Sequence, residues 1–361
     1  MKEKTKTKPK ENVKSQKAET KKTKEDVKKP KRLIKKVCII FIVSVLVYTA
    51  MSMIGSVIIF NIIFSRSANI EAFELTYQDV DSSAYPREEV YFMSGGNKLY
   101  GCVYKPEKSS QGLILLANGM NCCIDRHLPE IMYFVDNGFT VMTYENTGVD
   151  KSEGGGTVGI AQARLDADSA IDYISKDSEL SRLPLVMYGH SLGAYASATV
   201  LNDKKEVRAV VCVAGFNSPN ENMLHFAKKY VGAFADLQYP FMCLQNFFLF
   251  GTIADDTAIN AINSTKVPVM VIGGNSDDTV PDEISILNRK GEITNPNAEI
   301  VEITEPYRGE HSTAWLSAES AKYLEETKDP DDKELANILD EDYMKNVVDF
   351  YKRSISSEAV A

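Results

Sequence analysis

The residues best suited to chemistry in this sequence are a serine, an aspartate and a histidine, each placed after a short apolar run. Ser191 is the centre of Gly189-His190-Ser191-Leu192-Gly193, which follows the apolar residues 185–188 and precedes a run of small residues. This pattern is typical of a strand that turns sharply into a helix, with the serine hydroxyl at the apex. The crowded turn leaves room only for glycine two residues to either side. Ser191 is therefore a candidate nucleophile.

A serine hydroxyl needs a nearby base to take its proton, and the base needs an acid to orient it. His311 follows the last predicted strand, and Asp277 and Asp278 follow the buried apolar run 269–272. The carboxyl ends of parallel strands are where such sheets bind ligands. Taken singly, a loop carboxylate can cap a helix and a histidine can be structural. Together, Ser191, Asp277 and His311 form a candidate Ser-His-Asp triad.

The elements around these residues alternate between strands and helices. Strands are predicted at 89–94, 99–104, 113–117, 139–143, 185–188, 207–213, 267–272 and 298–303, with the first two forming a hairpin. Helices are predicted at 127–137, 161–175 and near 282–290. Such alternation predicts an α/β fold with a mostly parallel central sheet and helices on both faces.

The body, roughly residues 88 to 355, resembles an α/β-hydrolase of the monoacylglycerol-lipase and serine-aminopeptidase-like branch. The elbow at 189–193 and the order serine, aspartate, histidine match that superfamily. The stretch Gly274-Asn-Ser-Asp277, followed by Val280-Pro281, resembles its acid loop and so favours Asp277 over Asp278. The resemblance implies an α/β-hydrolase fold with a small helical cap, which we place at residues 217–263, between core segments 88–216 and 264–361.

Two loops depart from the family pattern. Residues 138–154 resemble its Asp-x-Arg-Gly-x-Gly stretch, but Thr147 replaces the arginine and Asp150 a glycine. Asn118 stands where a histidine is usual. This change matters little for an oxyanion, which backbone N–H groups bind. The resemblance implies Met120 and Leu192 as the two donors.

The cap segment is rich in aromatic residues and methionine. Such residues most often pack against the body, but a cap above Ser191 would line an apolar pocket. Phe247, Phe248 and Asn118 are the candidate pocket residues.

The chain before the body contains a basic tail and an apolar run. Residues 1–36 hold 16 Lys/Arg and 5 Asp/Glu, which leaves 25 basic and 45 acidic residues in the rest of the chain. The tail has too few apolar residues for a core and is predicted to be disordered. Residues 37–64 carry no charge and are long enough to span a bilayer. A signal peptide usually has a shorter apolar region, and a buried soluble helix would need a large core.

We therefore expect a transmembrane anchor at 37–64, followed by a linker at 65–87. The positive-inside rule places the basic tail in the cytoplasm and the body outside. On this topology the tail binds no nucleic acid. Apart from Cys38 in the anchor, five cysteines remain, so at least one is unpaired; a bridge from Cys122 or Cys123 to Cys243 is one alternative.

The predicted function is hydrolysis of carboxylic esters through an acyl-enzyme, without a metal or cofactor. The substrate is expected to be a small ester or peptide, or an amphiphile if the linker holds the body near the bilayer. Cleavage of amides or peptides is the alternative within enzymes, because both reactions use the same triad. A non-catalytic binding scaffold is the alternative outside enzymes.

Overall fold

The computed structural model describes residues 12–67, 70–204 and 206–356. The chain divides into two compact units, up to Gly55 and from Ser56 onward. Helix α1 (Asn12–Ile63) forms the first unit and continues into the second. The structure gives residues 12–36, for which the sequence predicts disorder, a helical backbone. Lysine and glutamate are good helix formers, and they extend a helix already begun by the apolar run. Residues 1–11 of the predicted tail lie outside the described part.

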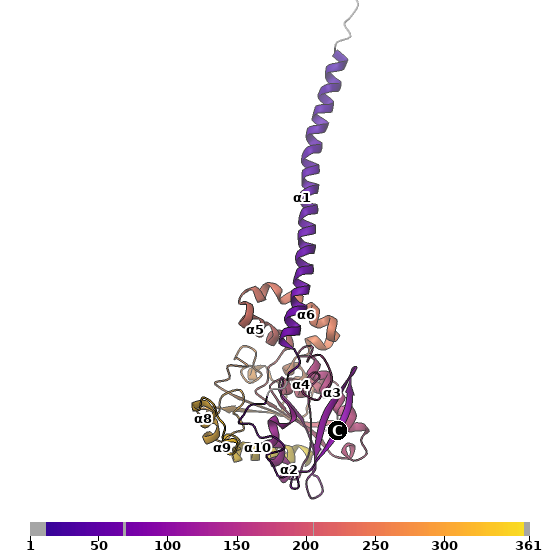
Figure 1. The fold of residues 1–361 in the computed structure, drawn as a ribbon. Helices are drawn as coiled ribbons and strands as arrows, with labels where there is room; N and C mark the ends of the chain where they lie inside the picture. Colours follow the sequence, from indigo (N-terminus) through magenta and orange to yellow (C-terminus); the bar gives the residue numbers. More distant parts are fainter. Residues whose placement is uncertain (1–11, 68–69, 205, 357–361) are drawn as a thin grey trace, which may run out of the picture. The chain divides into compact units, whose positions relative to one another are not determined.

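The second unit is built on one eight-stranded sheet in the order β1-β2-β4-β3-β5-β6-β7-β8 (Figure 1). Strands β1 and β2 are antiparallel, β2 also pairs antiparallel with β4, and the other pairs are parallel. The strands are β1 (Arg87–Ser94), β2 (Asn97–Tyr104), β3 (Leu113–Ala117), β4 (Thr140–Tyr144), β5 (Leu185–His190), β6 (Val207–Val213), β7 (Val269–Gly274) and β8 (Ala298–Ile303). The predicted α/β architecture is confirmed.

Helices cover both faces of this sheet. One apolar cluster joins the sheet to α3, α4 and α7, and a second joins its other face to α2, α8 and α10. Strands β3, β4, β5 and β7 are fully buried because both their faces are covered. The bounds are α2 (Leu128–Asp136), α3 (Gln162–Lys176), α4 (Leu192–Thr199), α5 (Pro219–Val231), α6 (Phe234–Phe250), α7 (Ala258–Asn263), α8 (Ala318–Glu326), α9 (Lys333–Ala336) and α10 (Glu341–Ser356).

The helix predicted near 282–290 does not form. The backbone there bonds to the loop after β6 instead: Ile286 N–H donates to the Gly215 carbonyl, and Asn217 N–H donates to the Ile284 carbonyl. These bonds occupy groups that a helix would use for its own ladder. Residues 282–290 therefore form a series of turns.

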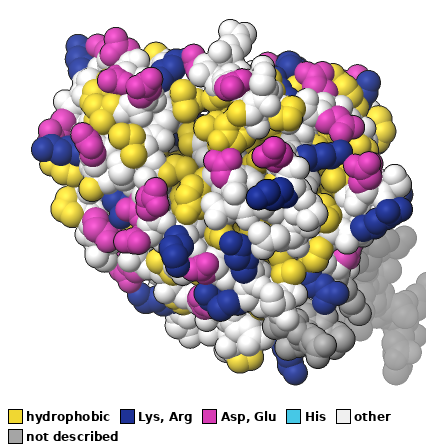
Figure 2. All heavy atoms as spheres, turned by 90° about the horizontal axis from the view of Figure 1, so that it is seen from below, with side chains coloured by type: hydrophobic (Ala, Val, Ile, Leu, Met, Phe, Trp, Pro, Cys, Tyr) yellow, Lys and Arg dark blue, Asp and Glu magenta, His cyan; other side chains and the backbone are white. Residues whose placement is uncertain are grey.

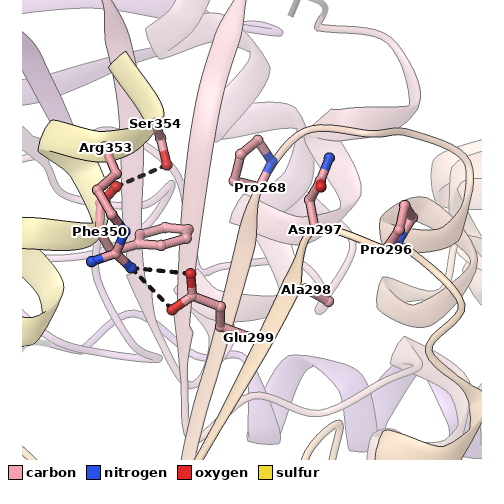
Figure 3. A pocket seen from close by; sticks show the side chains of 8 residues that line it. All are labelled: Pro268, Pro296, Asn297, Ala298, Glu299, Phe350, Arg353 and Ser354. Atoms are coloured by element: carbon pink, nitrogen blue, oxygen red, sulfur yellow. Dashed lines mark hydrogen bonds and ion pairs between the residues drawn. The ribbon is translucent and has the colours of Figure 1, made fainter. Parts of the chain in front are cut away.

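The surface away from α5 and α6 is ordinary for a globular domain. Acidic and basic side chains are interspersed there with apolar ones (Figure 2). A hollow of about 340 Å³ opens at the amino ends of β7 and β8, where Arg353 contacts Glu299 at 3.0 Å (Figure 3). It lies at the sheet edge opposite the loops that follow β5, β7 and β8. Ligands of such sheets bind at the carboxyl edge, so this hollow is not the candidate site.

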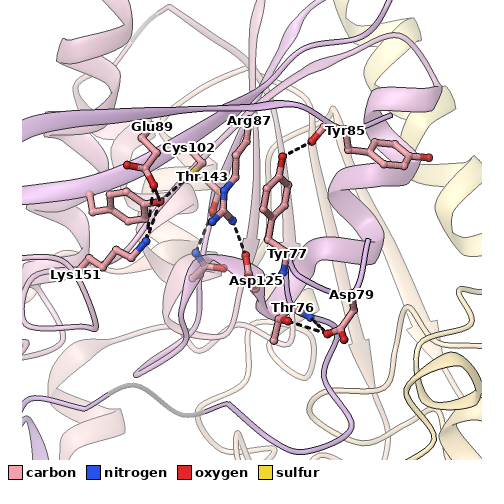
Figure 4. A network of polar contacts seen from close by, with 12 residues as sticks. Thr76, Tyr77, Asp79, Tyr85, Arg87, Glu89, Cys102, Asp125, Thr143 and Lys151 are labelled. Carbon is pink, nitrogen blue, oxygen red and sulfur yellow. Dashed lines mark hydrogen bonds and ion pairs between the residues drawn. The ribbon is translucent and has the colours of Figure 1, made fainter. Parts of the chain in front are cut away.

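The segment predicted as a linker, 65–87, is in fact attached to the body. Tyr77 N–H donates to the Asp125 carboxylate at 3.0 Å, and Arg87 contacts the same carboxylate at 3.1 Å (Figure 4). Nearer the anchor, Arg66 donates to the carbonyls of Ser152 and Gly154 at 2.8 and 2.9 Å. These hydrogen bonds and the ion pair join the segment to the body at both of its ends. The described parts of 65–87 thus form a strap along the body.

Candidate active site

Ser191 occupies a tight turn between β5 and α4. Its φ is 55° and its ψ is −113°, a conformation that is costly for a non-glycine residue and common at functional sites. A Cβ on Gly193 would lie 1.9 Å from the Ala117 carbonyl oxygen, and one on Gly189 would lie 2.2 Å from the Gly193 oxygen. The turn can pack this closely against β3 only because both flanking residues lack side chains.

The structure brings the three predicted residues together. His311 Nε2 lies 2.9 Å from Ser191 Oγ, and His311 Nδ1 lies 2.8 Å from Asp277 Oδ2. The other Asp277 oxygen accepts hydrogen bonds from the backbone N–H groups of Thr279 and Val280, at 2.9 and 2.8 Å. The carboxylate is thereby fixed with one oxygen toward the imidazole. In this geometry Nδ1 carries the proton given to Asp277, and Nε2 is free to accept one from the serine.

Backbone contacts hold the loop that carries His311 against the end of β7 and the loop that follows it. Ser276 N–H donates to the Gly309 carbonyl at 3.1 Å. A Cβ on Gly274 would lie 2.0 Å from that same oxygen, so the two loops touch backbone to backbone. Arg308 is nearly buried; it pairs with Asp340 at 3.0 Å and donates to a backbone carbonyl at 3.1 Å. These contacts fix the position of His311 relative to the sheet.

His190 is a residue whose role the sequence did not reveal. Its Nε2 lies 2.9 Å from the main-chain carbonyl of His311. Because a carbonyl can only accept, Nε2 carries the proton. The ring is buried between Trp315 and His127, with centroids 4.9 and 5.3 Å away. Burial, helped by the nearby His311, holds the pKa of His190 well below its usual range, so the ring is neutral. The signal in the sequence was only its position beside Ser191.

The two predicted oxyanion donors lie at chain positions suited to that role. Leu192 is the first residue of α4, and the first N–H groups of a helix have no acceptor within it. Met120 is the second residue of a turn closed by the Cys122 N–H to Gly119 carbonyl bond at 3.4 Å. The third residue of that turn, Asn121, has a φ of 61°. The turn bond does not use the Met120 N–H group.

The three predicted pocket residues have other surroundings. Asn118 is fully buried, and its amide donates to Thr143 Oγ1 at 3.0 Å and to the Tyr144 carbonyl at 2.9 Å. It therefore joins the ends of β3 and β4. Phe247 and Phe248 are 48% and 71% exposed on α6, on the side of this helix opposite its buried residues. Their exposure does not support the predicted acyl pocket.

All six cysteines are free, so the alternative bridge to Cys243 does not form. Cys122 lies beside the Met120 turn, where its Sγ contacts the Met120 carbonyl at 3.4 Å. Burial raises the pKa of its thiol to about 12. A thiol that stays protonated at neutral pH is a poor nucleophile. Ser191 is thus the only hydroxyl or thiol among the described residues that we find paired with the His311 imidazole.

The sheet order, the serine turn and the loops after β7 and β8 define an α/β-hydrolase, and the protein has that fold. Residues 108–258 match the family model for serine aminopeptidase, S33. An α/β-hydrolase domain-containing protein of Arabidopsis thaliana is 28% identical over 157 residues, which cover 42% of this chain and 48% of that protein. The matched part thus spans about half of that relative.

Solved structures give the same result for the fold. An esterase from Pyrococcus furiosus superposes with a TM-score of 0.57 at 17% identity, covering 81% of this chain and all of the esterase chain. An acylaminoacyl peptidase from Pyrococcus horikoshii gives a TM-score of 0.51 at 13% identity, covering 78% of this chain and 43% of the peptidase chain. The chain is similar to both enzymes in fold.

Proposed function

We propose that this protein is a membrane-anchored serine hydrolase that cleaves carboxylic esters through an acyl-enzyme. The observation that carries the proposal is the hydrogen-bonded chain from Ser191 Oγ through His311 to Asp277. His311 takes the hydroxyl proton as Ser191 attacks the ester carbonyl, and Asp277 holds the imidazole in the required tautomer. His311 then returns the proton to the leaving alkoxide. Water hydrolyses the acyl-enzyme by the same route.

The Leu192 and Met120 N–H groups are the proposed oxyanion donors. The charge on the carbonyl oxygen grows as the tetrahedral intermediate forms, and backbone donors fixed in advance stabilise it. Losing one such donor typically lowers the rate by about 10²–10³. Apart from the water that hydrolyses the acyl-enzyme, the reaction as written uses groups that the chain supplies.

The choice of ester over amide rests on the esterase neighbour, and the amide reaction is retained as the second candidate. The matching family is described as a serine aminopeptidase, and one structural neighbour is an acylaminoacyl peptidase. Both reactions use the same three residues; they differ in the leaving group that His311 must protonate.

The proposed anchor is the apolar part of α1. Arg32–Ile63 is long and apolar enough to cross a membrane, and 6% of its most apolar window is buried. A core helix of a soluble protein would be mostly buried, and this one is not. We propose that the basic residues before it stay in the cytoplasm and the catalytic domain lies outside.

A fluorophosphonate probe tests the chemistry, because it reacts with an activated serine. The full-length protein should label, and Ser191→Ala should not; labelling of the variant, or none of the wild type, would refute the serine mechanism. A panel of p-nitrophenyl esters and aminoacyl amides then decides between the two candidates. Protease added to intact cells should remove the body and spare the tail. Loss of the tail alone would reverse the proposed topology.

A further inference from the structure

Helix α6 buries three amide side chains together with Ala235, Met242 and Phe250, and it exposes large apolar side chains on its other side. Gln238, Gln245 and Asn246 are buried. By contrast, Phe234 and Leu237 are each 54% exposed. In a soluble protein an amphipathic helix packs the opposite way, with its apolar stripe against the core.

Among the inward amides, that of Asn246 is held by a hydrogen bond to α5. Asn246 Nδ2 donates to Asn220 Oδ1 at 2.9 Å, and Asn220 in turn donates to Asp255 Oδ1 at 3.0 Å. A buried amide group that keeps a hydrogen-bond partner costs less than one that has none. The helix is thus built to present its apolar side to its surroundings.

The exposed side forms a continuous surface with the end of α5. We call it the cap face and define it by six large side chains: Tyr230, Phe234, Leu237, Leu244, Phe247 and Phe248. Monomeric soluble proteins rarely expose so many neighbouring apolar side chains. Asp236 is the only charged residue in α6. The opposite surface of the domain, with its mixed charges, has no such character (Figure 2).

The cap face continues onto the end of α1. An apolar groove of about 120 Å³ is lined by Ile59, Ile62 and Ile63 of α1 and by Ala227, Tyr230 and Val231 of α5. These residues all belong to the second unit. Figure 1 likewise shows α5 and α6 beside the last turns of α1. This groove therefore joins the last turns of α1 to the cap face.

The end of α1 is also fixed to the body. Ser56, Phe60 and Phe64 recur every four residues and are all buried, while Ile58 and Ile62 on the other side are more than half exposed. Thr157 N–H donates to the Phe64 carbonyl at 3.0 Å. Because this end of α1 is fixed to the body, the cap face lies at the same depth in a bilayer as the end of α1.

We propose that the cap face lies in the interfacial layer of the bilayer that α1 spans. This inference rests on the membrane part of the proposed function. Continuity with an apolar helix end favours lipid as the occupant over a second protein. Lys228 and Lys229 at the end of α5 flank the face, as basic residues do beside interfacial helices.

Three aromatic residues replaced singly by tryptophan provide a matched test in the full-length chain. Phe248→Trp reports the cap face, Phe41→Trp reports α1, and Tyr91→Trp reports the exposed hairpin strand β1, away from the cap. The native Trp315 is buried and supplies a constant background, measured in the wild type. Each protein is reconstituted in phosphatidylcholine vesicles with bromine atoms placed either near the carbonyl end or near the methyl end of the acyl chains. Bromine quenches tryptophan emission on contact.

We expect F248W to lose emission most with bromine near the carbonyl end, F41W to lose emission with bromine at one or both depths, and Y91W to lose none. Quenching of F41W without quenching of F248W overturns the inference and leaves the anchor intact. Failure of both to quench overturns the anchor and the inference together. If F248W is unquenched and its emission shifts as the protein is diluted with lipid, the cap face is a contact between copies of the chain, and the inference is wrong. Catalytic activity enters none of these readouts.

Discussion

The hydrogen bond from His190 to the main chain of His311 makes a specific prediction about catalysis. His190→Phe keeps a ring between Trp315 and His127 but removes the donor at Nε2. The His311 carbonyl then loses a buried partner that lies 2.9 Å away. Leaving a buried acceptor unpaired costs about 1–3 kcal/mol. If the loss displaces His311 and raises the activation free energy by this amount, kcat decreases about 5- to 150-fold.

The assay is hydrolysis of a water-soluble p-nitrophenyl ester, with kcat and KM measured separately. His190 is a positioning residue, so H190F should lower kcat while KM stays close to the wild-type value. The ring is neutral in the wild type, because burial holds the His190 pKa well below its usual range. The pH profile should therefore keep its midpoint, which a role for His190 as a charge would shift.

His190→Gln is the matched control, because its amide can still donate from near the position of Nε2. It should recover most of the kcat lost in H190F. An unchanged kcat in H190F would refute the reasoning. So would an H190Q variant as slow as H190F, since restoring a donor at this position would then restore no activity. Thermal unfolding of each variant checks that a slow enzyme is still folded.

The remaining predictions concern the cap face, the acid and a buried carboxyl group. Leu237→Asp should lower hydrolysis of a long-chain ester in vesicles but not of a soluble ester, because a charged side chain resists entry into the membrane interface. Ile338→Asp, at an exposed site on the body, is the control. Equal effects of the two substitutions would contradict the cap-face proposal. Asp277→Asn should lower kcat by about 10⁴, as in the type case of the triad, and near-normal turnover would exclude this aspartate as the orienting acid. Burial raises the pKa of Glu145 from 4.5 to about 7, so folding favours its protonated form. That stabilisation, about 3 kcal/mol at most, is complete below about pH 4.5 and lost as the pH rises through about 7. Glu145→Gln should therefore unfold with a flatter dependence on pH than the wild type, and parallel curves would show that Glu145 does not carry the effect.

Several features of this protein could be read from the sequence because they are local. A strand, a sharp turn and a helix around Ser191 need only a run of apolar residues, two glycines and small residues after them. The carboxyl end of a strand is likewise a local feature, and it singled out Asp277 and His311. An uncharged run of 28 residues predicts a membrane helix without reference to the rest of the chain.

Other features were decided only by tertiary packing. The bond between His190 and His311 joins residues 121 positions apart, and no periodicity encodes such a pair. The segment 282–290 has a sequence compatible with a helix, but the loop after β6 takes its backbone groups. The sequence of α6 is apolar on nearly every side, so its composition does not tell which side faces the body. The buried amide of Asn246 helps to fix this orientation, because it donates a hydrogen bond to Asn220 of α5. A sequence specifies periods and turns directly, whereas the pairing of distant polar groups and the direction of an apolar face follow from how the elements pack.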